Sequence, residues 1–131
     1  MYKEVVICII IIVMIVSLDI FTQKYTQKTT SEITQIFADL KGEILKEDKN
    51  KIGEKVKILD EMWGQKHNKL AYYIEHDELE KVDTAIVCLK SYAETEDYSS
   101  AVAELDEGKF VLEHIQKKYA FNLENIFEIV F

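Results

Sequence analysis

The sequence predicts an all-α protein in which an N-terminal transmembrane helix is followed by an antiparallel bundle of about four helices. Three observations support this prediction. The 131 residues include no proline and only four glycines, and proline is the residue that interrupts helices most strongly. An unbroken apolar run extends from Val5 to Val16. Beyond it, apolar residues recur every three or four positions, and no stretch alternates with the period of two that is typical of strands.

The apolar run continues to Phe21, interrupted only by Ser17 and Asp19. A helix over Val5–Phe21 would be about 26 Å long, slightly less than the roughly 30 Å of a hydrocarbon core. We therefore expect residues 1–21 to be a membrane anchor that contacts the lipid bilayer through Val5 to Phe21. A cleaved signal peptide is the alternative reading, but residues 17–21 contain no pair of small residues for a signal peptidase.

The orientation of this anchor is predicted from its flanks. Lys3 precedes the run, and Lys24 and Lys28 follow it, so the positive charges are nearly balanced across it. A tail of four residues is easily left in the cytoplasm. We therefore expect a single-pass protein of the cell membrane, with its larger part on the extracytoplasmic side.

Four apolar stripes follow the anchor, and we expect them to form the core of a helical bundle over residues 31–131. In chain order the stripes are Ile33, Ile36, Phe37, Leu40 and Ile44; Ile52, Val56, Leu59, Trp63, Leu70 and Ile74; Leu79, Val82, Ile86 and Leu89; and Val102, Leu105, Leu112 and Ile115. His67 takes the place of an aliphatic residue in the middle of the second stripe.

Capping residues predict where these helices begin. Thr30 or Ser31 is expected to cap the first bundle helix, so residues 22–30 would either continue the anchor helix or form a juxtamembrane stalk. Residues 46–50, which include no apolar side chain, are expected to be a connection. Asp77 and Asp97 are expected to cap the third and fourth helices.

A last cap is expected at Asn122. It would begin a short terminal turn that holds Leu123, Ile126 and Phe127.

Charge and cysteine content exclude several classes of function. All 16 basic residues are lysine, and from Thr22 onward 15 lysines face 22 acidic residues. This net charge of −7 would repel nucleic acid, and arginine, the preferred ligand of phosphates and base edges, is missing, so we expect no nucleic-acid partner. Cys8 lies in the apolar run and Cys88 far along the chain, so no disulfide framework is expected.

The densest polar cluster is Glu75-His76-Asp77-Glu78, followed closely by Glu80. Imidazole and carboxylate groups are competent metal ligands, and His76 and Glu80 would share a helix face. The plainer reading, a solvated turn between helices, is favoured, because no second histidine follows at helical spacing. We therefore expect no resident metal or cofactor and name Glu75, His76, Asp77 and Glu80 only as weak metal candidates.

The sequence contains none of the common catalytic motifs. It carries no nucleophile elbow, phosphate-binding loop or dinucleotide fingerprint, so no catalytic activity is expected. Tyr72, Tyr73 and His76 are instead a possible interaction surface. The two tyrosines would point about 100° apart on a helix, so at least one should reach solvent.

The later part of the chain resembles a family of small bacterial membrane proteins, domain of unknown function 4363. The segments that carry the resemblance are Trp63, Tyr73–Asp83, Leu89–Tyr92, Glu96–Asp97, Ala101–Leu105, Leu112–Ile115 and Asn122–Phe127. The resemblance implies a Firmicutes source, a place at the cell envelope, and the company of a multi-spanning membrane protein of the YetF-like kind. It implies no biochemical activity, because the family has no established one.

These observations together predict an accessory or interaction protein of the bacterial cell envelope, which docks a helical domain onto a membrane partner. The alternative is an extracytoplasmic, sensor-like domain that binds a ligand or a metal ion between its helices. Association of the chain with copies of itself, through the bundle or the anchor, stays open.

Overall fold

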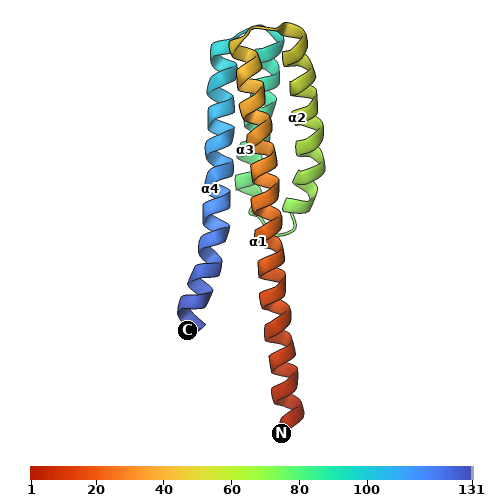
Figure 1. Ribbon diagram of the computed structural model, residues 1–131, viewed down its shortest axis with the longest axis vertical. Helices are drawn as coiled ribbons and strands as arrows, with labels where there is room; N and C mark the ends of the chain where they lie inside the picture. Colours follow the sequence, from red (N-terminus) through yellow and green to blue (C-terminus); the bar gives the residue numbers. More distant parts are fainter. Residues whose placement is uncertain (131) are drawn as a thin grey trace.

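The computed structural model describes the backbone of residues 1–130 and the side chains of residues 1–119. Four helices account for nearly all of it: α1 (Tyr2–Leu45), α2 (Lys49–Leu70), α3 (His76–Glu94) and α4 (Tyr98–Val130). Residues 1–130 contain no strand, so the predicted all-α class is confirmed. The first helix is the longest, and its N-terminal part extends well beyond the other three (Figure 1).

The membrane-spanning candidate and the first bundle helix are one continuous helix, α1. The predicted cap at Thr30 or Ser31 is therefore wrong, and residues 22–30 continue the helix. The hydroxyl of Thr30, one of the two suggested caps, instead bonds within the helix. Its Oγ1 donates to the Thr26 carbonyl at 2.8 Å, just as Thr26 Oγ1 donates to the Thr22 carbonyl at 2.7 Å.

The apolar N-terminal part of α1 stands clear of the bundle. Except for the partly buried Val16, its large side chains from Val5 to Phe21 are exposed, most by more than half of their surface. Among the described residues, α1 is the one helix long and apolar enough to cross a membrane, and a signal sequence near the N-terminus would share those properties. Packing against the other helices begins beyond this stretch, where Thr26, Thr29 and Thr30 are buried.

The starts of α2 and α3 differ from the prediction. The connection between α1 and α2 is shorter than expected, because Asp48 caps α2 by accepting a hydrogen bond from the Lys51 amide at 3.3 Å. The predicted cap at Asp77 is wrong: α3 begins at His76, and Asp77 lies in its first turn. Negative charge is favourable there because the N-terminal end of a helix is electropositive.

The start of α4 is as predicted, since Asp97 accepts a hydrogen bond from the Ser100 amide at 3.3 Å. The short terminal turn predicted at Asn122 is not separate, because the backbone of α4 continues without a break to Val130. The side chains of Asn122, Leu123, Ile126 and Phe127 lie outside the described part of the chain.

The four predicted stripes meet in one core. Its buried members include Ile33, Leu40, Leu59, Trp63, Leu70, Leu79, Val82, Leu89, Leu105, Leu112 and Ile115. Ile36, Val56 and Val102 lie only partly buried against it, and Ala101 takes the fully buried place beside Val102. Gly108 allows α4 to approach α1 closely, because a Cβ there would lie 3.0 Å from the Phe37 ring.

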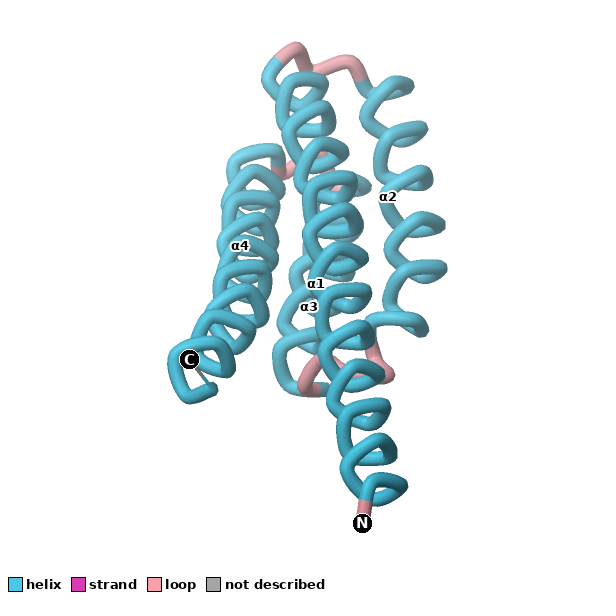
Figure 2. The backbone as a smooth tube through the Cα atoms, turned by 60° about the horizontal axis from the view of Figure 1, so that its bottom comes forward, coloured by secondary structure: helices cyan, strands magenta, loops and turns pink. Residues whose placement is uncertain are grey.

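Each helix packs against the next in an antiparallel order, and α4 closes the ring against α1 (Figures 1 and 2). The α3–α4 pair is the closest, and α2 lies most loosely against α3. The bundle therefore has two distinct ends. We call the end where the α2–α3 turn, Ala71–Glu75, lies beside Thr22 and Thr26 the near end, because the apolar part of α1 emerges there. The far end holds the α1–α2 and α3–α4 turns.

Candidate functional site

The weak metal candidates do not converge in the structure. Glu75, His76, Asp77 and Glu80 are all exposed around the first turns of α3. Within the described residues, no group of three or more histidine, cysteine, aspartate or glutamate side chains is placed to hold a metal ion. What the cluster does contain is one inward-facing carboxylate, Glu78, which the sequence gave no reason to separate from its neighbours.

Glu78 is only 7% exposed and is held by α4. The Lys118 ammonium donates to Glu78 Oε1 at 3.1 Å and also lies 3.4 Å from Glu75 Oε1. His114 Nε2 lies 3.7 Å from the same Glu78 oxygen. The hydrogen bond to Glu78 raises the pKa of Lys118, because it favours the charged ammonium. A buried carboxylate needs such a partner, so this contact ties α3 to α4.

A second polar cluster connects the α2–α3 turn to α1 by hydrogen bonds. The hydroxyls of Tyr73 and Thr26 are hydrogen bonded at 2.6 Å, and the Tyr73 hydroxyl also reaches the Thr22 carbonyl at 3.4 Å. The Tyr119 ring packs edge-on against Tyr73, and its hydroxyl accepts a hydrogen bond from the Glu75 amide at 3.0 Å. Burial raises the pKa of both tyrosines, because it disfavours the phenolate.

The two neighbouring tyrosines of the predicted interaction surface therefore differ in environment. Tyr72 is 90% exposed, as expected for one of the pair, whereas Tyr73 is half-buried in the bundle. His76, the third residue of that surface, is exposed on α3.

A third polar cluster lies between α2 and α3. Trp63 Nε1 donates to Asp83 Oδ1 at 2.5 Å, and His67 Nε2 lies 3.2 Å from the other oxygen of the same carboxylate. The Trp63 and His67 rings pack edge to face at 5.8 Å. The only sequence signal was the histidine in an apolar stripe, four residues after the tryptophan. Asp83 thus accepts a hydrogen bond from the Trp63 indole, whereas His67 Nε2 lies within ion-pair distance of the carboxylate without a hydrogen bond to it.

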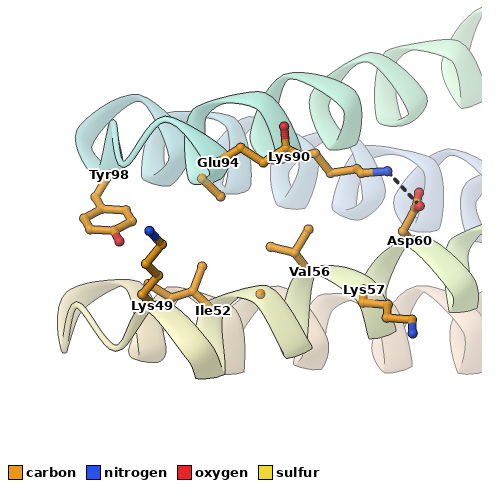
Figure 3. Close-up of a pocket in the computed structure, with 10 residues that line it drawn as sticks. Lys49, Ile52, Val56, Lys57, Asp60, Lys90, Glu94 and Tyr98 are labelled. Carbon is orange, nitrogen blue, oxygen red and sulfur yellow. Dashed lines mark hydrogen bonds and ion pairs between the residues drawn. The ribbon is translucent and has the colours of Figure 1, made fainter.

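The far half of the α2–α3 contact opens into a groove of about 430 Å³. Its floor is apolar, and Figure 3 shows Ile52 and Val56 of α2 turned toward the opposite wall. The rim is charged. Lys90 Nζ donates to Asp60 Oδ2 across one end of the groove at 2.9 Å. The remaining lining residues are Lys49, Gly53, Lys57, Ala93, Glu94 and Tyr98.

Comparison with known proteins agrees with the sequence resemblance. The family model described as Domain of unknown function (DUF4363) matches residues 20–126. The chain belongs to this family. Neither the curated proteins nor the solved structures include a match to it.

The matched region begins at the last apolar residues of α1 and covers all of the bundle except the last residues of α4. Both ends of the bundle therefore lie inside it, together with the groove and all three polar clusters. The sequence did not predict the groove, because it arises where α2 and α3 separate, and the spacing of apolar residues does not report the distance between two helices.

Proposed function

We propose that the chain is a membrane-anchored accessory protein of the bacterial cell envelope. Its bundle would bind an amphipathic helix of a membrane-protein partner in the α2–α3 groove. The apolar part of α1 would be the single transmembrane anchor, with the bundle on the extracytoplasmic side. No catalytic step is part of the proposal.

The observation that carries the proposal is the groove itself. Elsewhere the apolar stripes face one another in the core, whereas Ile52, although 2% exposed, and the partly buried Val56 also line an opening between two antiparallel helices. A groove with an apolar floor between paired helices is a common receptor for the apolar face of a third helix. The lining extends from Lys49 to Asp60, about three turns of α2.

The rim indicates the charge of the partner helix. Three lysines line the groove, Lys49, Lys57 and Lys90, against two acids, Asp60 and Glu94. Lys90 is paired with Asp60 at 2.9 Å, and Lys49 is paired at 3.2 Å with Glu96, which lies just outside the lining. The rim is therefore nearly balanced in charge, and charge complementarity favours a partner helix whose flanks carry both signs.

The distance between the groove and the near end of the bundle limits which part of a membrane protein can reach it. From Leu70 at the near end, the helical rise places Asp60 about 15 Å and Lys49 about 32 Å along α2. If the anchor spans the bilayer, the groove stands clear of the membrane. The partner helix would therefore belong to an extramembrane segment. The family resemblance suggests a multi-spanning protein of the YetF-like kind as the partner.

A small-molecule sensor is the second candidate, and the size of the groove is the observation that favours it. Its volume of about 430 Å³ lies within the range of small-molecule sites, roughly 300–1,000 Å³. The same experiment separates the two candidates, since only a protein partner gives a macromolecular crosslink.

The test is photo-crosslinking of the full-length protein in its native membrane, with a photoreactive amino acid at Val56. Ile58 is the matched control, because it is an aliphatic residue on the same helix that is 44% exposed and does not line the groove. The proposal predicts an adduct from position 56 with an integral membrane protein, mapped to an extramembrane helix, and no such adduct from position 58. Equal adducts from both positions, or adducts only with the chain itself, would contradict it.

A further inference from the structure

Phe21 ends the apolar stretch of α1, and the next residue, Thr22, already takes part in the near end of the bundle. The Tyr73 hydroxyl lies 3.4 Å from the Thr22 carbonyl and is hydrogen bonded to Thr26 Oγ1. The α2–α3 turn is therefore held at the height where the apolar stretch stops. One residue along a helix is a rise of only about 1.5 Å, so a bilayer that ends near Phe21 reaches the turn, together with the backbone of α4 beyond Tyr119, which continues on the same side to Val130 (Figure 1).

The turn cannot move freely away from this height. Thr26 is 1% exposed and Ile74 is 4% exposed, so both sides of the Tyr73 contact are fixed in the core. Tyr119 holds the same turn from α4 through the Glu75 amide. Three helices thus position Ala71–Glu75 against the end of the anchor.

Tyr72 is the side chain that this arrangement leaves outside. It is 90% exposed, although its neighbours Tyr73 and Ile74 are turned into the bundle. A tyrosine ring has an apolar body and a polar tip, and such side chains are enriched where a membrane meets water. A membrane surface at this height would contact the ring that water now surrounds.

Charges of both signs surround the turn, which ends on the exposed Glu75 and is followed by the exposed Asp77. The two segments that precede these acids at the near end, Ile20–Ser31 and Met62–Ile74, contain no acidic residue. They carry four lysines: Lys24, Lys28, Lys66 and Lys69. Except for Lys66, which lies 3.8 Å from Glu32, these are exposed. Lysines near a bilayer surface are attracted to anionic headgroups.

We infer that the α2–α3 turn lies in the headgroup layer of the bilayer and that Tyr72 inserts there as an interfacial anchor. The occupant of this surface is lipid, and the turn holds the bundle upright on the membrane. The inference rests on the membrane anchoring in the proposed function and is independent of the groove.

The test uses full-length protein in vesicles of phosphatidylcholine and phosphatidylglycerol, with a nitrobenzoxadiazole label on a single cysteine. The first variant, Cys88→Ala, keeps Cys8 and reports on the anchor. Two others combine Cys8→Ala and Cys88→Ala with Tyr72→Cys or with Asn50→Cys, the latter on the exposed start of α2 at the far end. Lys69→Cys replaces Tyr72→Cys if circular dichroism shows that the latter does not fold.

The readouts are the emission maximum of the label and its quenching by aqueous iodide. The label at Cys8 should be the most protected, the label at Tyr72 several-fold better protected than the one at Asn50, and the label at Asn50 fully quenched. Equal quenching at positions 72 and 50, with Cys8 protected, would overturn the interfacial role of Tyr72 and leave the anchoring intact. A freely quenched Cys8 label would overturn the anchoring, and this inference with it.

Discussion

The near and far ends of the bundle are built from the same kind of amphipathic helix but are held together differently. At the near end, partly buried polar contacts join residues distant in sequence, such as Tyr73 with Thr26 and Glu78 with Lys118. At the far end, the charged contacts are between exposed side chains, such as Lys49 with Glu96 and Lys41 with Asp106. Exposed ion pairs of this kind contribute little to stability and are screened by salt.

The far end also contains backbone strain and an opening. Glu47 and Glu96 have positive φ angles of 57° and 58°, in the left-handed region that glycine occupies most readily. The groove begins beside these two turns and extends along α2 to the middle of the bundle. The comparison suggests that the near end fixes the bundle relative to α1, whereas the far end keeps the adaptability that partner binding needs.

The largest effect should come from the core at the near end. Leu70 is 1% exposed and Ile52, on the floor of the groove, is 2% exposed. Leu70→Ala should lower the free energy of unfolding by about 2–5 kcal/mol, because it leaves a closed cavity. Ile52→Ala should fall at the low end of that range, because the groove already admits water. Chemical denaturation measures both, and an equal or larger loss for Ile52→Ala would contradict the comparison.

The next effect concerns the buried carboxylate. Lys118→Met removes the ammonium that holds Glu78 and should lower the melting temperature clearly more than Lys109→Met, whose exposed partner Glu113 lies 4.0 Å away. Adding Glu78→Gln to Lys118→Met should restore part of the loss, because no unpaired charge then stays buried. An equal decrease in melting temperature for the two lysine variants would show that the buried charge of Glu78 does not need Lys118 as its partner.

Tyr73→Phe should lower the free energy of unfolding by about 0.5–1.5 kcal/mol, since the hydrogen bond to Thr26 is lost. Tyr72→Phe, its exposed neighbour, is the matched control and should have no effect. The pKa of Tyr73 is raised in the folded state, so its contribution is complete below the ordinary value of 10.0. This contribution to stability is lost as the pH rises above 10.0 and through the higher pKa that Tyr73 has in the folded protein.

The same pair of variants tests this pH dependence. Stability measured across the alkaline range should fall less steeply in Tyr73→Phe than in the unmodified protein or in Tyr72→Phe. Identical slopes in all three proteins would show that the buried hydroxyl of Tyr73 is not a source of the alkaline loss.

The smallest effect should be a gain at the far end. Residue 47 has a left-handed backbone conformation, which glycine adopts without the steric cost of a side chain. Glu47→Gly also gives the unfolded chain more freedom, which opposes this effect, so the free energy of unfolding should rise by only about 0.5 kcal/mol. Lys46→Gly, at the adjacent residue with φ of −83°, should instead destabilise the protein. Thermal melting of the two variants is sufficient, and a loss in Glu47→Gly would argue that the turn is not strained.

The helices and their core were predictable because apolar spacing is a local property of the sequence. The stripes through Phe37, Leu59 and Leu89 lie where the spacing placed them. The cap at Thr30 or Ser31 was predicted wrongly, since a hydroxyl that caps a helix also bonds well within one. The polar contacts at the near end could not be predicted, because each joins two residues that are far apart in the sequence. Glu78 and Lys118 are 40 residues apart, and Thr26 and Tyr73 are 47 apart.

Hydrogen exchange, followed by mass spectrometry on the full-length protein in lipid bilayers, tests the contrast between the two ends most directly. The account predicts that amides of the near turn, Ala71–Glu75, exchange more slowly than those of the far turns, 46–48 and 95–97, because side chains of α1 and α4 hold the near turn and the bilayer covers it. Exchange in the near turn that is as fast as in the far turns, or faster, would contradict the account.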